Sequence, residues 1–97
     1  DGPTDDVLTL GDLRAKYESF GWRVWECNGN DMQELVDTFN KIRENAHKGQ
    51  SQILLAHTEM GMGVDFMMGT HKWHGVAPND EQAANALSQL KETLGDY

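Results

Sequence analysis

The residues of this chain best suited to chemistry lie in segment 58–78, which is rich in glycine and methionine and carries His71 and His74. Neither a helix nor a strand periodicity runs through it. Irregular segments longer than about 12–15 residues are usually either functional or disordered. Disorder is disfavoured, because a solvated linker rarely carries apolar groups such as Phe66 and Trp73. We therefore expect an ordered loop that contacts a ligand.

The two histidines of this loop admit several roles. An imidazole can donate a hydrogen bond to a phosphate oxygen and can transfer protons near neutral pH. Taken alone, His74 is either such a group or a histidine whose hydrogen bonds are satisfied within the structure. A metal site formed by His71, His74, His57 and Asp65 is a further interpretation, but the H-x-x-H spacing matches no common zinc motif.

The glycines of the loop suggest a close approach of the backbone. Gly61-x-Gly63 follows an apolar strand, which invites a dinucleotide-binding interpretation. That fingerprint needs a third glycine where this chain has Phe66, and a helix that the pattern does not show. Gly61, Gly63 and Gly75 either let the backbone approach a ligand or turn the chain.

Composition excludes some classes of partner. Eight basic against sixteen acidic residues give a net charge of −8, whereas nucleic-acid binding needs a basic footprint. No apolar run approaches the roughly 20 residues of a membrane span. The single cysteine, Cys27, is expected to be a small core residue and fits a reducing cytoplasm. We expect neither a nucleic-acid nor a membrane partner.

Apolar periodicity predicts helices at both ends of the chain. Asp1–Thr4 has turn chemistry, and Thr9 is predicted to cap a helix that has Asp12 in its capping-box position and ends at Gly21. Asn79 is predicted to cap the last helix, with Gln82 as its capping-box partner. The expected inward positions of the two helices are Leu10, Leu13, Tyr17 and Phe20, and Ala83, Ala86, Leu87, Leu90 and Leu94.

A strand, a helix and a second strand are predicted between them. Residues 22–27 are aromatic and β-branched, and residues 53–57 are almost continuously apolar, as in a parallel strand covered on both faces. Residues 31–48 form the helix, which Gly49 is expected to end. Its predicted buried face consists of Met32, Leu35, Val36, Phe39, Ile42 and Ala46. About 35 residues is the size of one βαβ unit.

The predicted fold class is therefore α/β, a partial parallel-sheet three-layer unit in the order helix, strand, helix, strand, long loop, helix. Two strands alone leave both edges of a sheet bare and make a weak sheet. Such a chain either oligomerises edge to edge or is a piece of a larger α/β domain, and we favour the piece.

The order of several motifs resembles the transketolases. The motifs are D-G-P-T at the start, Lys16-Tyr17 through Gly21-Trp22-x-Val24, Gly29-x-Asp31, Gly61-x-Gly63 after a strand ending in Thr58, Trp73-His74-Gly75 before Pro78, and the ending Glu92–Tyr97. The resemblance is to the carboxyl-terminal third of the thiamine-diphosphate-binding half, which some bacteria and archaea make as a separate subunit. Residues 1–97 are accordingly interpreted as the carboxyl-terminal segment of a transketolase-like thiamine-diphosphate-binding domain.

This resemblance implies an activity and partners. Transketolases move a two-carbon ketol unit between sugar phosphates, as in the cytoplasmic pentose phosphate pathway, using thiamine diphosphate and a divalent metal (Mg or Ca). The family's metal motif would lie upstream of residue 1, and the activating glutamate belongs to the other half of the protein. The chain alone is therefore not expected to be active. Its implied partners are a second transketolase half and the rest of its own subunit, in a homo- or hetero-oligomer.

The resemblance also implies site residues. His74 matches the family's H-G element and would be both catalytic and cofactor-binding. Met60 would line the cofactor site together with Gly61, and no metal ligand is assigned to this chain. Two other interpretations remain open at this stage: a non-catalytic α/β binding or assembly module, and a piece of another thiamine-diphosphate enzyme, such as a deoxyxylulose-phosphate synthase or a dehydrogenase subunit.

Overall fold

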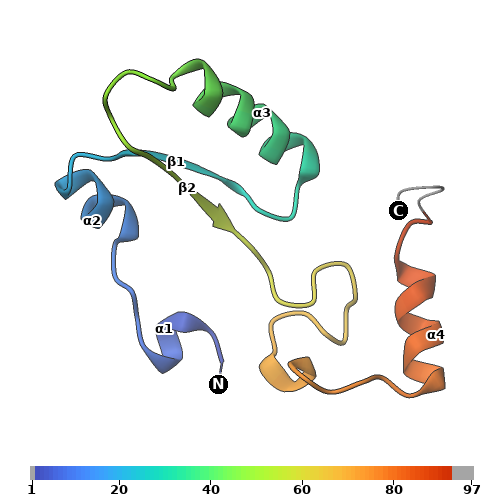
Figure 1. Cartoon of the computed structure of the whole chain (residues 1–97). Helices are drawn as coiled ribbons and strands as arrows, with labels where there is room; N and C mark the ends of the chain where they lie inside the picture. Colours follow the sequence, from blue (N-terminus) through green and yellow to red (C-terminus); the bar gives the residue numbers. More distant parts are fainter. Residues whose placement is uncertain (1, 93–97) are drawn as a thin grey trace. The chain divides into compact units, whose positions relative to one another are not determined.

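The computed structural model describes residues 2–92. These residues fall into two compact units, a first unit of Thr4–Thr58 and a second unit of residues 2–3 together with 59–92. The elements in chain order are α1 (Thr4–Val7), α2 (Leu13–Ser19), β1 (Arg23–Asn28), α3 (Met32–Glu44), β2 (Gln52–His57), η1 (His71–Trp73) and α4 (Asp80–Gln89) (Figure 1). Among these described residues, no helix is long and apolar enough to cross a membrane.

β1 and β2 form a two-stranded parallel sheet in the first unit, and α3 connects them (Figure 1). Arg23 lies opposite Gln52, and Asn28 lies opposite His57. A hydrogen bond from Gly29 N to His57 O, 2.7 Å long, extends the ladder beyond β1. The strand–helix–strand prediction and the α/β class are thereby confirmed.

Helices α2 and α3 cover opposite faces of this sheet. Side chains alternate between the faces of a strand. Arg14 of α2 reaches Glu26 of β1, while Gln52 of β2 donates to Ile42 O in α3 at 3.0 Å. Gln52 pairs with Arg23 and shares its face of the sheet, whereas Glu26, three residues after Arg23, points to the other face. The two helices therefore lie on different sides of the sheet. The unit is thus the three-layer fragment that the sequence predicted.

The buried core of each unit is small. Val24 and Cys27 point to opposite faces of β1, and both are buried, as was expected for Cys27. In the second unit, Val64 of the loop and Ala86 of α4 are buried.

The first predicted helix begins later than expected, so the assignment of Thr9 as its cap is wrong. Gly11 has a φ of +63°, a left-handed conformation that cannot belong to a helix. Asp12 is the actual N-cap, since its Oδ1 accepts from Ala15 N at 2.9 Å. Phe20, predicted to be inward, is 74% exposed.

Helix α3 ends at Glu44 instead of Lys48. Asn45 is its C-cap, and His47 has a φ of +62°, so the chain has already left the helix before Gly49. Asp31 caps the start of the helix, with its Oδ1 accepting from Glu34 N at 3.0 Å. Glycine was therefore a correct signal for a turn here, but not for the position of the helix end.

The predicted buried face of α3 is only half correct. Leu35 and Ile42 are partly buried on either side of the buried Thr38. Ala46 is also partly buried, but it lies beyond the end of the helix, and the remaining predicted positions are exposed, namely Met32, Val36 and Phe39. They form a second stripe beside the one that contacts the sheet.

Helix α4 has the predicted capping box. Asn79 Oδ1 accepts from Gln82 N at 2.8 Å, and Asn79 N donates to Gln82 Oε1 at 2.9 Å. Leu87 and Leu90, predicted to face inward, are exposed. The predictions for Leu94 and for the last residues of the chain lie outside the described residues.

Candidate functional site

The long loop after β2 is closed by its own backbone. Between Glu59 and Pro78 it contains no strand, as predicted, and its one regular element is the short 3-10 turn η1. Gly69 N donates to Met60 O at 3.2 Å and so joins the two ends of the glycine- and methionine-rich half. Inside this closure, Val64 N donates to Gly61 O at 3.1 Å.

Gly61 is required by the way this loop packs on itself. It has a φ of +67°, and a Cβ at this position would lie 2.3 Å from the carbonyl oxygen of Met67. Gly75, with a φ of +88°, has no atom within 4 Å of such a Cβ. Gly61 therefore serves a close approach within the chain itself, which neither of the two explanations from the sequence included. The open space beside Gly75 is compatible with both of them.

Trp73 fixes the second half of the loop. Its indole Nε1 donates to Phe66 O at 3.1 Å, and the two rings make an edge-to-face contact with centroids 5.4 Å apart. Edge-to-face pairs of this kind add about 0.5–1.5 kcal/mol beyond the burial of their area. Trp73 thereby anchors the turn that precedes His74.

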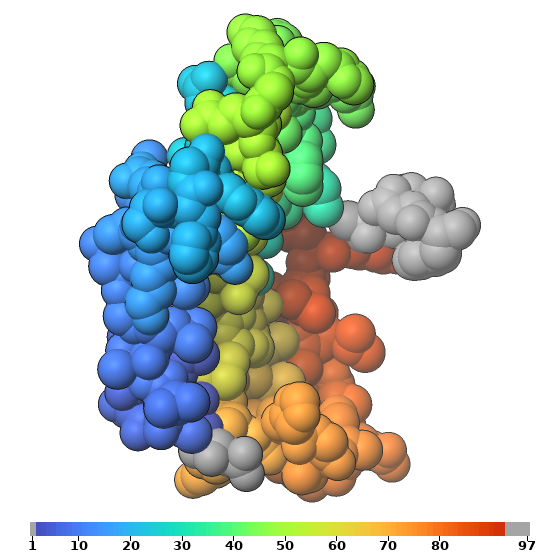
Figure 2. All heavy atoms as spheres, turned by 60° about the vertical axis from the view of Figure 1, so that its left-hand side comes forward, coloured from blue at the N-terminus to red at the C-terminus, as the bar shows by residue number. Residues whose placement is uncertain are grey.

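His74 follows directly after η1. Its backbone N donates to His71 O at 2.9 Å, and Thr70 caps the turn by accepting from Lys72 N at 3.3 Å. The imidazoles of His71 and His74 are exposed, and among residues 2–92 neither makes a hydrogen bond or an ion pair. The atoms of this part of the chain, orange in Figure 2, lie at the surface. The imidazole of His74 is thus available to a ligand.

The three predicted site residues do not contact one another through hydrogen bonds. Met60 and Gly61 lie in the first half of the loop, whereas His74 lies at the end of the second half. No hydrogen bond between described residues joins Met60 or Gly61 to His74. Their shared role at a cofactor stays a prediction.

The structure argues against the alternative metal site. Within the described part of the chain, no group of three or more histidine, cysteine, aspartate or glutamate side chains is arranged to hold a metal ion. Asp65, one of the proposed ligands, is instead hydrogen-bonded to Gln89 of α4. What the loop offers a phosphorylated cofactor is a hydrogen-bond donor, the exposed imidazole of His74.

The contact between Asp65 and Gln89 was not found from the sequence. Gln89 Oε1 accepts from Asp65 N at 2.8 Å, and Gln89 Nε2 donates to Asp65 Oδ1 at 2.9 Å. These residues are 24 positions apart, so no local pattern could have paired them. The sequence indicated only a pairing within α4, because Asn85 and Gln89 are four residues apart on one face of the helix. Gln89 Nε2 does donate to Asn85 Oδ1 at 2.9 Å.

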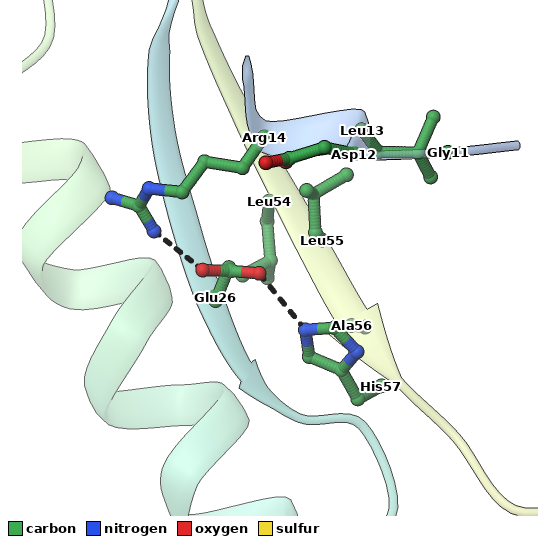
Figure 3. A pocket seen from close by; sticks show the side chains of 9 residues that line it. All are labelled: Gly11, Asp12, Leu13, Arg14, Glu26, Leu54, Leu55, Ala56 and His57. Carbon is green, nitrogen blue, oxygen red and sulfur yellow. Dashed lines mark hydrogen bonds and ion pairs between the residues drawn. The ribbon is translucent and has the colours of Figure 1, made fainter. Parts of the chain in front are cut away.

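A second cluster of polar side chains lies in the first unit, beside a hollow of about 420 Å³ (Figure 3). Glu26 accepts from Arg14, and its Oε1 lies 3.1 Å from His57 Nε2. Residues that line the hollow are Gly11, Asp12, Leu13, Arg14, Glu26, Leu54, Leu55, Ala56 and His57. The parallel register could have revealed this cluster, because Glu26 and His57 point to the same face of the sheet.

Charge pairing determines what this cluster can do. The hydrogen bond from Arg14, followed by the one from His57, lowers the pKa of the Glu26 carboxyl group. The same contact with Glu26 raises the pKa of Arg14. Glu26 is therefore a carboxylate at neutral pH and is unsuited to act as a proton donor there. The cluster attaches α2 to the sheet.

Residues 1–95 match the family described as transketolase, thiamine diphosphate binding domain. The chain is 36% identical over 93 residues to a subunit of the apulose-4-phosphate transketolase of Phocaeicola vulgatus, covering 96% of the chain and 32% of that protein. The protein of the same name from Actinobacillus succinogenes is 37% identical over 91 residues, covering 94% of the chain and 32% of that protein. A 6-deoxy-6-sulfo-D-fructose transketolase subunit from a Clostridium species is 26% identical over 92 residues, covering 95% of the chain and 33% of that protein. The chain spans about a third of the length of these curated relatives.

Proposed function

The chain belongs to the family of transketolase thiamine diphosphate binding domains, and from this premise we propose that it works as the carboxyl-terminal part of such a domain. The complete enzyme would transfer a two-carbon ketol unit between sugar phosphates. This chain would supply one wall of the site for the cofactor and the donor sugar. The observation that carries the proposal is the exposed imidazole of His74, which follows a turn anchored through Trp73.

Thiamine diphosphate, bound with a divalent metal such as Mg or Ca, would supply the electron sink that cleavage of a carbon–carbon bond requires. His74 would donate a hydrogen bond to the diphosphate. It would also exchange a proton with the oxygens of the transferred unit, for which an imidazole is suited near neutral pH. Met60 would contribute an apolar wall, and Gly61 allows the fold of the loop that carries it.

The partners are part of the same proposal. The relatives from Phocaeicola and Actinobacillus are each named as one subunit of a transketolase, which supports a second subunit that completes the enzyme. The exposed stripe of Met32, Val36 and Phe39 on α3 supports further protein contacts for this fragment. The proposal also places the enzyme in the cytoplasm and in sugar-phosphate metabolism of the pentose phosphate type.

A paired substitution tests this function in the complete enzyme with thiamine diphosphate, magnesium and a ketose phosphate donor. His74→Ala is expected to lower turnover by about 10²–10⁴, the usual effect of losing a positioned proton-transfer group. It should also weaken cofactor binding by about 1.5–3 kcal/mol, since a hydrogen bond to a charged group is lost. His71→Ala is the matched control, because this imidazole is exposed in the same turn.

Equal effects of the two substitutions would assign the role to the shape of the loop and not to the imidazole of His74. Absence of ketol transfer by the complete, unsubstituted enzyme would overturn the enzymatic proposal and favour a non-catalytic module.

A further inference from the structure

The side chain of Gln89 ties the long loop to the last turn of α4. Its amide oxygen accepts from the backbone N of Asp65 at 2.8 Å, and its amide nitrogen donates to the Asp65 carboxylate at 2.9 Å. Two bonds to one residue fix both the position of the loop backbone and the orientation of the Asp65 side chain. We refer to this contact as the Asp65–Gln89 pair.

The orientation of the Gln89 amide is determined by its surroundings. Nε2 also donates to Asn85 Oδ1 at 2.9 Å, one helical turn earlier. A flipped amide would place its oxygen against the oxygens of Asp65 and Asn85 and would place its nitrogen against the Asp65 N–H. A second contact lies nearby, because a Cβ on Gly63 would come within 2.9 Å of Leu90 Cδ2. The end of α4 therefore meets the loop at two adjacent points.

One hydrogen bond and two steps between neighbours in the chain connect this pair to His74. Asp65 is followed in the chain by Phe66, whose carbonyl oxygen accepts from the indole of Trp73 at 3.1 Å. Trp73 immediately precedes His74. A displacement of Asp65 would move the acceptor that anchors Trp73, and so would move the turn that carries the imidazole.

We propose that Gln89 is a positioning residue that acts through Asp65 to hold the loop in the conformation that presents His74 to the cofactor. The inference rests on the proposed function, in which His74 contacts the diphosphate and the transferred unit. Gln89 itself touches no reacting group. Displacements of about 1 Å by remote changes can cost up to roughly a hundredfold in rate, and because the pair is exposed to solvent we expect a smaller effect, of about tenfold.

The test is the variant Gln89→Glu in the complete enzyme. The glutamate can still accept from Asp65 N, but its second oxygen would face the carboxylate of Asp65. We expect kcat/KM for the donor sugar to fall about tenfold and hydrogen exchange of loop amides 62–76 to accelerate. Adding Asp65→Asn restores a donor opposite the new carboxylate, so the double variant should recover to within about twofold. Ser88→Glu places the same charge on the neighbouring, exposed position of α4 and should change neither measurement.

A third combination separates positioning from general stability. In a His74→Ala background, Gln89→Glu should cause no further loss of kcat/KM, because it acts through His74. Losses that multiply would overturn the positioning role, and so would a failure of Asp65→Asn to restore activity. Faster loop exchange with unchanged kcat/KM would also overturn it, while leaving the proposed function intact. If the unsubstituted enzyme transferred no ketol units, the proposed function would fail, and the positioning role with it.

Discussion

Replacement of Gly61 by alanine tests whether the fold of the long loop depends on close approach of its own backbone. The alanine would keep a φ of +67°, which costs an L-residue about 1–2 kcal/mol. Its Cβ would also lie 2.3 Å from the carbonyl oxygen of Met67, and a backbone atom cannot rotate away as a flexible side chain can. Relieving such overpacking costs about 1–3 kcal/mol more. The expected total is about 2–5 kcal/mol of lost loop stability.

Gly75→Ala is the matched control in the same loop. It has a similar left-handed φ of +88°, but nothing lies within 4 Å of the added Cβ, so only the conformational cost of about 1–2 kcal/mol applies. Both alanines stiffen the unfolded chain equally, so this contribution of about 0.4–1 kcal/mol cancels in the comparison. The difference between the two variants thus isolates the contact with Met67.

The assay is amide hydrogen exchange of Val64 and Met67 in the complete enzyme, which reports local opening of the loop. Val64 N donates to Gly61 O, and Met67 N donates to Val64 O at 3.0 Å, so both amides lie inside the closed part of the loop. Gly61→Ala should reduce their free energy of protection by about 1–3 kcal/mol more than Gly75→Ala does. Equal losses in the two variants would refute the reasoning, because the close approach would then carry no cost.

Two further predictions concern the first unit. Glu26→Gln should destabilise the protein more at neutral pH than in acid. The hydrogen bond from Arg14 lowers the pKa of the Glu26 carboxyl group, so its contribution to stability is fully present above the unfolded-state pKa of about 4.3 and is lost as the pH falls through the lower pKa of the folded protein. Thermal unfolding at about pH 3 and about pH 7 measures this difference, and an equal loss of stability at both would contradict it. The backbone N–H groups of Leu54 and Ala56 point away from β1, so in the isolated chain they should exchange faster than the N–H of Leu55. If another strand joins β2 in the complete domain, these two amides should become protected. Continued fast exchange of both amides there would show that this edge of the sheet stays open.

Several features were predicted correctly from the sequence because the interactions that form them involve residues close together in the chain. The capping box of Asn79 and Gln82 depends on residues three positions apart, and both of its bonds are present. The parallel strands follow from apolar composition and from a crossover of the right length. The burial of Cys27 and the absence of a strand in the long loop were also correct.

The sequence predictions were wrong where the same residue pattern was compatible with two local structures. Thr9 and Asp12 are both capping residues, and the left-handed Gly11 between them decided for Asp12. The apolar residues of α3 form two adjacent stripes, and periodicity alone could not tell which would contact the sheet. Gly49 marked a turn, but the helix had already ended at Glu44.

The sequence by itself determined the α/β class, the βαβ unit, the family and the identity of the histidine-bearing loop. These depend on local periodicity, on capping and on motifs in order along the chain. Only the tertiary structure decided that Gly61 packs against the backbone of Met67, that Gln89 holds Asp65, and that Glu26 is shared by Arg14 and His57. The physical reason is that each of these contacts joins groups brought together by chain folding, and their energies depend on distances that no sequence spacing specifies.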